Sequence, residues 1–179
     1  MRAPVQPYAQ APQPVPQPMY SSDPLDASVY RLGSGDAVRI DVLGEAELSL
    51  EVLIDPSGLI NYPFLGTIQA AGNTVRELEL KIRNGLRGGY LVNPDVRVGL
   101  ARYRPVFISG QVRQPGSYPY TLGLNVEKAI TLAGGVSPFG STSRVYRQRN
   151  GSSDDDRIKV SLDSAVLPGD YIIVEERLF

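Results

Sequence analysis

Apolar positions recur in two successive blocks of the chain, and each block predicts strands around one helix. In the first block apolar residues alternate with polar ones, as at Val38, Ile40 and Val42, which is the period of a half-buried strand. They then recur at helical spacing behind Thr74 and Glu77, a pair that forms a capping box at a helix N-terminus. The expected elements are strands at 29–32, 37–42, 51–54 and 59–62, a helix over 75–86 and a strand at 96–100.

The second block repeats this order with shorter elements. Asn125 is a suitable helix cap, and Gly134 and Gly135 can adopt the backbone angles that end a helix. The expected elements are strands at 106–109 and 117–120, a helix over 126–133, and strands at 144–147, 158–160 and 171–174. The pattern therefore predicts an α+β fold of two small β-grasp-like domains, each with a mixed sheet and one main helix.

A Gly-Asp pair precedes a strand in each block, at Gly35–Asp36 and at Gly169–Asp170. Glycine permits a positive φ, and the aspartate carboxylate can accept hydrogen bonds from nearby amides. We interpret both pairs as turns rather than as ligand sites.

Residues 1–28 show neither the alternation of a strand nor the spacing of a helix. They carry a proline at nearly every second or third position over much of their length. Such a composition blocks helix and sheet pairing and favours extended polyproline II conformation. We interpret the segment as a semi-rigid spacer, with a ligand for a proline-reading domain as the alternative. The expected organisation is a tail at 1–28, a first domain at 29–103 and a second at 104–179.

The composition of the chain limits the kinds of binding and catalysis that it can support. Among 179 residues the formal net charge is −1, which gives no basic excess to attract nucleic acid. Histidine and cysteine are absent, which removes the commonest general base, the commonest metal ligand and any thiolate nucleophile. The acidic run at 154–156 is interpreted as a solvated loop rather than a cation site. We expect no catalytic residue, no cofactor and no metal, and hence a protein that is not an enzyme.

Tyrosines and arginines near turns are the candidate contact residues. Tyrosine combines an apolar ring with a hydroxyl, which suits sugar stacking and protein interfaces, although a partly buried core position is the alternative. Arginines of the second block could line a passage for an acidic polymer or form pairs between subunits, and we favour the pairs. The candidates for polymer or interface contact are Tyr62, Tyr90, Tyr103, Arg104, Tyr118, Arg144 and Arg147.

Several of these segments together resemble the Wza-type polysaccharide export family. The stretches similar to its export domain are 30–36, 47–49, 55–60, 63–66 and 90–98. The stretches similar to its soluble-ligand-binding (SLBB) β-grasp domain are 106–112, 114–118, 129–135 and 167–174. Each short match consists largely of turn residues, so the resemblance rests on their order and spacing over roughly 150 residues.

The resemblance implies a periplasmic component of capsule or exopolysaccharide export that oligomerises and guides the polymer across the envelope. Its implied partners are polysaccharide, further copies of itself and an inner-membrane polysaccharide co-polymerase. Larger family members carry a C-terminal pore helix that is not in this sequence, which therefore resembles the short periplasmic members or is a fragment. For a short member, a separate outer-membrane pore protein is a further expected partner. The family's signal peptide and lipidated cysteine are also not in this sequence, and a tail placed after that cysteine would be lipid-anchored to the outer membrane. The alternative is a small-ligand or carbohydrate-binding β-grasp module without an export role.

Overall fold

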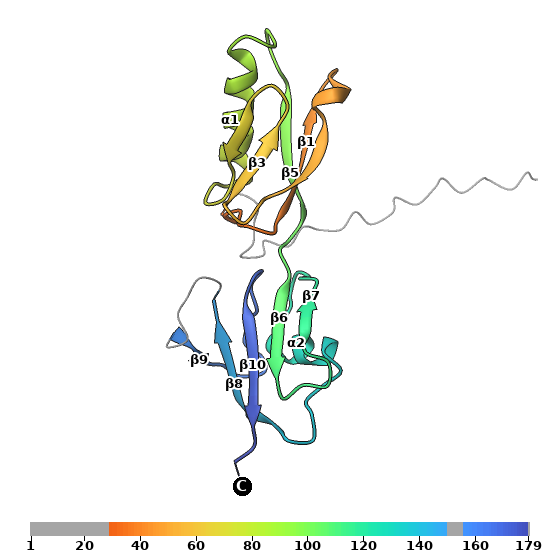
Figure 1. Ribbon diagram of the computed structural model, residues 1–179, viewed down its shortest axis with the longest axis vertical. Coiled ribbons are helices and arrows are strands. Elements are labelled where there is room, and N and C mark those ends of the chain that lie inside the picture. Colours follow the sequence, from red (N-terminus) through yellow and green to blue (C-terminus); the bar gives the residue numbers. More distant parts are fainter. Residues whose placement is uncertain (1–28, 150–155, 179) are drawn as a thin grey trace, which may run out of the picture.

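The computed structural model describes residues 29–149 and 156–178. Figure 1 shows two domains that follow one another along the long axis, connected by the chain between β5 and β6. The predicted spacer at 1–28 and most of the acidic run at 154–156 lie outside the described residues.

The first domain is built from antiparallel strands and one long helix. Its elements are β1 (Ala37–Val42), the 3-10 turn η1 (Ala46–Leu48), β2 (Leu50–Leu53), β3 (Leu59–Tyr62), β4 (Gly66–Gln69), α1 (Val75–Arg87) and β5 (Val96–Arg102). The strand order is β2-β1-β5, and β3 and β4 form a separate hairpin. The alternating residues of β1 and the apolar stripe of α1 meet in one core that includes Ile40 and Ile82.

The capping box predicted for α1 is confirmed. Thr74 Oγ1 accepts a hydrogen bond from the Glu77 N–H at 3.2 Å, and Glu77 Oε2 accepts one from the Thr74 N–H at 2.8 Å. Further along α1, Glu79 Oε2 accepts from the Val98 N–H and Arg83 donates to the Val96 carbonyl. These two side chains therefore satisfy part of the outer edge of β5, which would otherwise be open to pairing with another strand.

The second domain is a five-stranded mixed sheet covered on one face by a short helix. Its elements are β6 (Val106–Gly110), β7 (Gly116–Tyr118), α2 (Val126–Leu132), β8 (Gly140–Gln148), β9 (Ile158–Lys159) and β10 (Tyr171–Glu176). The strand order is β7-β6-β10-β8-β9, in which only the β6–β10 pair is parallel. Asn125 caps α2 through its side-chain oxygen, as the sequence predicts.

The predicted fold class, α+β with two small β-grasp-like units, is confirmed, but three details differ. The sheet pairings of the first domain are all antiparallel rather than mixed. The segment 29–32 is not a strand, because Leu32 alone exchanges backbone hydrogen bonds with Gly72 and Asn73. Strand β4 was not predicted, since its short run between glycine and alanine holds a single large apolar residue, Ile68.

Within the described ranges, no helix is both long enough and apolar enough to cross a membrane.

Candidate functional site

Arg104 joins the two domains where the chain passes from β5 to β6. Its backbone N–H donates to Asp36 Oδ1 at 2.6 Å, its Nη1 donates to Asp36 Oδ2 at 3.0 Å, and its Nε donates to the Pro168 carbonyl at 3.0 Å. The Asp36 side chain is 0% exposed and the Arg104 side chain 23% exposed. Because both partners are largely withdrawn from water, the charge-assisted bonds between them are strong and their loss would leave a buried charge unpaired.

Glycines make room for the Arg104 side chain on both sides. A Cβ on Gly33 would lie 2.1 Å from Arg104 Nη1, and a Cβ on Gly169 would lie 2.6 Å from Arg104 Nε. The guanidinium therefore lies between a turn of the first domain and a turn of the second. We call the contacts among Arg104, Asp36 and Pro168 the interdomain clasp.

The two Gly-Asp turns at this junction have the same hydrogen-bond geometry. Asp36 Oδ2 accepts from the Gly33 N–H at 2.8 Å, and Asp170 Oδ2 accepts from the Leu167 N–H at 2.8 Å. The turn interpretation of both pairs is thus confirmed. What the sequence does not indicate is that the carboxylate of the first turn also binds Arg104.

Three tyrosine rings connect the domains beside the clasp. The Tyr103 ring centroid lies 5.3 Å from that of Tyr30 and 5.1 Å from that of Tyr120, in edge-to-face geometry both times. Tyr103 packs against the cores of both domains. The Tyr30 hydroxyl donates to Asp36 at 2.8 Å, and burial, together with the Asp36 charge, raises the pKa of Tyr30 well above its usual range. Tyr30 therefore remains a neutral donor to the clasp.

Of the remaining candidate tyrosines, only Tyr90 is well exposed. Tyr62 lies in the first core, where its hydroxyl donates to the Leu48 carbonyl at 2.7 Å and burial raises its pKa to about 12. No face of the Tyr62 ring is open to a polymer, so we remove it from the contact residues. Tyr118 is half-buried and donates to the Gln114 carbonyl at 2.6 Å, which stabilises the bend between β6 and β7. Tyr90 pairs with Phe64, as described below.

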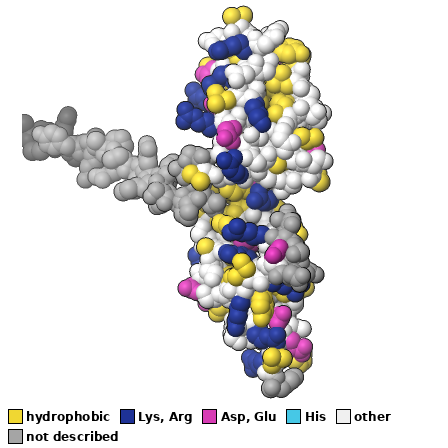
Figure 2. Space-filling view, turned by 90° about the vertical axis from the view of Figure 1, so that its left-hand side faces the viewer, with side chains coloured by type: hydrophobic (Ala, Val, Ile, Leu, Met, Phe, Trp, Pro, Cys, Tyr) yellow, Lys and Arg dark blue, Asp and Glu magenta, His cyan; other side chains and the backbone are white. Residues whose placement is uncertain are grey.

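The candidate arginines of β8 have partners within the chain. Arg144 forms an ion pair with Glu175 of β10 and donates to the Glu176 carbonyl. Arg147 donates to the Ala165 carbonyl at 3.0 Å. Figure 2 shows Lys and Arg side chains spread along the visible face, with several near the level where the domains meet. A charged ligand at β8 would therefore meet two arginines that already form intramolecular bonds.

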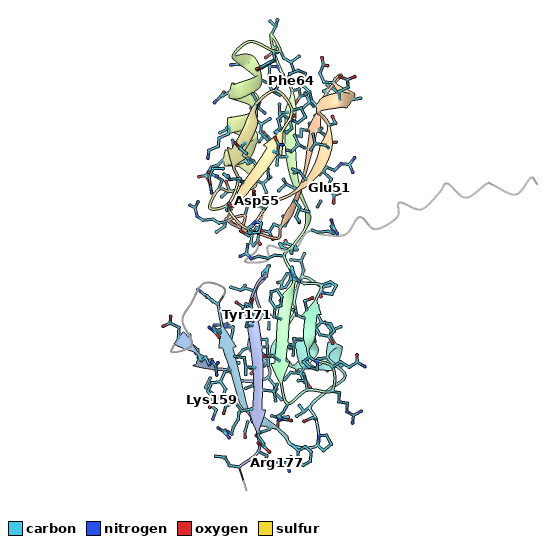
Figure 3. All side chains as sticks on the ribbon, in the orientation of Figure 1. Glu51, Asp55, Phe64, Lys159, Tyr171 and Arg177 are labelled. Carbon is cyan, nitrogen blue, oxygen red and sulfur yellow. The ribbon has the colours of Figure 1, made fainter. Side chains whose placement is uncertain are left out.

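The face of the second sheet that faces away from α2 carries aromatic residues that the sequence did not single out. Phe107 of β6 and Tyr171 of β10 stack with centroids 4.5 Å apart and an interplanar angle of 13° (Figure 3 labels Tyr171). Tyr146 and Ile173 are neighbours in the β8–β10 register on the same face. The sequence feature that could have indicated this face is the unbroken apolar run 171–174, because such a run is typical of a strand with both faces covered.

The described residues hold no cluster of acidic side chains that could bind a metal ion. Burial raises the pKa of Asp170, while the Leu167 amide and the positive charge of Arg147 oppose the shift. Asp170 is committed to its turn through the Leu167 N–H. The geometry thus provides a hydrogen-bonded junction between the two domains.

Comparison with known proteins identifies both domains. The chain matches the polysaccharide biosynthesis/export protein family over residues 25–101 and the SLBB domain over residues 105–160. Two domains of these kinds in this order define the class of polysaccharide export proteins. The first domain thus matches the polysaccharide biosynthesis/export protein family and the second matches the SLBB domain, which confirms the resemblance found in the sequence.

Three relatives illustrate the relationship. The chain is 32% identical over 153 residues to the exopolysaccharide production protein ExoF of Rhizobium meliloti, which covers 79% of this chain and 36% of ExoF. It is 25% identical to the EPS I polysaccharide export outer membrane protein EpsA of Ralstonia nicotianae, over 84% of this chain and 48% of EpsA. It is 28% identical to the polysialic acid transport protein KpsD of Escherichia coli, over 61% of this chain and 20% of KpsD. The chain therefore spans less than half the length of each of these relatives.

Proposed function

We propose that this chain is a non-catalytic component of capsule or exopolysaccharide export, which assembles with further copies of itself to guide the polymer across the periplasm. The observation that carries the proposal is the tandem of an export domain and an SLBB domain, fixed to one another by the interdomain clasp. A closed ring requires every copy to present the same two faces at the same angle. A two-domain subunit with a buried ionic connection meets that requirement better than one with a loose linker.

The proposal extends to location and partners. The relatives include an outer membrane export protein and a polysialic acid transport protein, which supports a place in the bacterial envelope. We propose a periplasmic location with a lipid anchor to the outer membrane. The proposed partners are the polysaccharide, an inner-membrane polysaccharide co-polymerase that delivers it, and a separate outer-membrane pore protein that completes the route. Nucleic acid is not a proposed partner, because the net charge is −1.

The match over residues 25–101 favours export over the alternative of a small-ligand module. That alternative depends on the second domain alone, whereas the first domain matches a family described by polysaccharide biosynthesis and export.

The proposal is tested by deleting the gene and by measuring the molar mass of the purified protein in solution. Deletion should abolish extracellular polymer, measured as precipitated hexose in the culture medium, and the plasmid-borne gene should restore it. Light scattering after size exclusion, over a concentration series, should show one closed oligomer. Unchanged extracellular polymer in the deletion strain would contradict the proposed function, whatever the mass in solution.

A further inference from the structure

Phe64 and Tyr90 form an exposed aromatic pair at the end of the first domain away from the second (Figure 3 labels Phe64). Phe64 is 62% exposed and Tyr90 is 53% exposed. Their ring centroids lie 5.2 Å apart at an interplanar angle of 39°. Among the aromatic pairs of the described residues, this is the pair in which both rings are more than half exposed.

The backbone holds the Phe64 ring outward. Phe64 has a φ of +64°, the one positive φ among the described residues other than glycine. A bulky side chain is disfavoured there, so the conformation must be imposed by its surroundings. The next residue, Leu65, packs against the first core, and a Cβ on Gly85 of α1 would lie 2.8 Å from Leu65 Cδ1. The hairpin turn is thus anchored to α1 by Leu65.

Tyr90 is held outward in a corresponding way at the end of α1. The N–H groups of Tyr90 and Leu91 both donate to the Leu86 carbonyl, at 3.1 and 2.9 Å. Leu91 packs against the first core while Tyr90 lies in solvent. Each ring therefore stands beside a leucine anchored in the core.

The sequence departs from local stability rules to build this pair. A phenylalanine occupies a left-handed position, and Gly85 occupies the last turn of α1, where glycine forms helix less readily than alanine. Departures of this kind persist where they serve binding or another function. The feature they produce here is two fixed aromatic faces in water.

We propose that the Phe64–Tyr90 pair is a stacking platform for the pyranose rings of an oligosaccharide, an assignment that rests on the proposed export function. The C–H groups on a pyranose face pack on aromatic rings, and the Tyr90 hydroxyl can bond to a sugar hydroxyl. Two rings match one or two sugar units in size, whereas a stable protein interface buries roughly 800 Å² per partner. A site along an export route has to bind weakly enough to release the polymer, and an open, shallow platform meets that condition.

The platform is tested by titrating the whole isotope-labelled chain with two probes, neutral cellotetraose and acidic hyaluronan tetrasaccharide, followed by ¹H–¹⁵N NMR. We expect saturable shifts at residues 63–66 and 88–92 with a dissociation constant of about 1 mM. Phe64→Asn and Tyr90→Ala should each weaken binding at least about tenfold. Phe64→Asn should not lower the melting temperature, because asparagine tolerates the left-handed backbone. Val92→Asn, an exposed apolar position on the same loop, is the matched control and should bind as the wild type does.

Three results would overturn the platform: no saturable shift with either probe up to 20 mM (about twentyfold the expected constant), unchanged binding in both variants, or a changed oligomeric mass in Phe64→Asn with unchanged binding. The third result would assign the pair to a contact between copies. The two hypotheses fail separately. Loss of export on gene deletion without oligosaccharide binding would refute the platform alone. The opposite combination is that the purified protein binds the oligosaccharide, Phe64→Asn removes this binding, and deletion of the gene leaves export intact. That combination would refute the proposed function and retain the platform.

Discussion

Asp36 shows why one residue type is required at the domain junction. Its two carboxylate oxygens accept hydrogen bonds from the Tyr30 hydroxyl, the Gly33 N–H, and the backbone and side chain of Arg104. An ionised carboxylate accepts about four hydrogen bonds and donates none, so this environment satisfies it completely. An asparagine at position 36 would direct the two N–H bonds of its amide nitrogen toward groups that also donate, so those hydrogen bonds would be lost.

Removing the cation of the clasp should be costly. We expect Arg104→Met to lower the free energy of unfolding by about 3 kcal/mol, because it leaves the Asp36 charge buried with only neutral donors. Arg102→Met is the matched control: Arg102 pairs with Glu51 at 3.3 Å but both side chains are exposed, so the loss should stay within about 0.5 kcal/mol. Urea denaturation followed by circular dichroism measures both. Equal losses in the two variants would show that the clasp contributes no more than a surface pair.

Sequence patterns identified the residue types at this site but not their partners. Arg104 and Tyr103 are predicted as contacts with polymer or partner, yet they contact Asp36 and Tyr30, some 68 and 73 positions earlier in the chain. Local periodicity carries no information on such distances. Tyr62 was a candidate contact residue but lies in the first core. The reason is related, because a tyrosine can be buried wherever a carbonyl, here that of Leu48, accepts a hydrogen bond from its hydroxyl.

Among the elements, the parallel pairing of β6 with β10 depends on a glycine at the end of β6. Gly110 lies opposite Val174 in the register and has a φ of +82°. A Cβ at this position would lie 2.1 Å from the Val174 carbonyl oxygen, a backbone atom that cannot move without breaking the sheet. Both the backbone angle and the close approach therefore require glycine.

Gly110→Ala should destabilise the protein by about 3 kcal/mol, from left-handed strain and the clash combined. Gly99→Ala on β5 provides the comparison, because no atom lies within 4 Å of its added Cβ and its φ is not positive. That variant should be neutral or slightly more stable, by up to about 0.5 kcal/mol. Thermal unfolding of both variants, with the wild type alongside, measures the difference. A neutral Gly110→Ala would mean that β6 and β10 adjust without loss of pairing.

The two helices were predictable because their signals are local. Thr74 and Asn125 precede the first turns that they cap, and the apolar spacing of each helix is contained within its own residues. Strand β4 was missed although its partner β3 is its neighbour in the chain, because its four residues hold one large apolar side chain. The pairing of β6 with β10, in contrast, joins segments that lie far apart in the chain. For β10 that partner lies more than 60 positions earlier, at Val106–Gly110, and alternation alone does not identify it.

At the scale of the whole molecule, two cores share one junction. The first core draws on residues 30–98 and the second on residues 106–174, and Tyr103 packs against both. Without contacts at the junction, two such domains would unfold independently, since an interface between domains is small compared with either core. The clasp and the Tyr30–Tyr103–Tyr120 rings should therefore set how far the unfolding of one domain depends on the other.

We expect the wild type to unfold in one calorimetric transition and Tyr103→Ala to unfold in two. The substitution removes both edge-to-face contacts while leaving each core otherwise intact, at a cost of about 2 kcal/mol, below the full core value because the ring is half-buried. Tyr118→Ala, which truncates a half-buried tyrosine of the second domain alone, should shift a single transition downward. If Tyr103→Ala also retained a single transition, the coupling would reside in Arg104 rather than in the rings. If the wild type already showed two transitions, the rigid subunit that a closed export ring requires would have to come from contacts between copies.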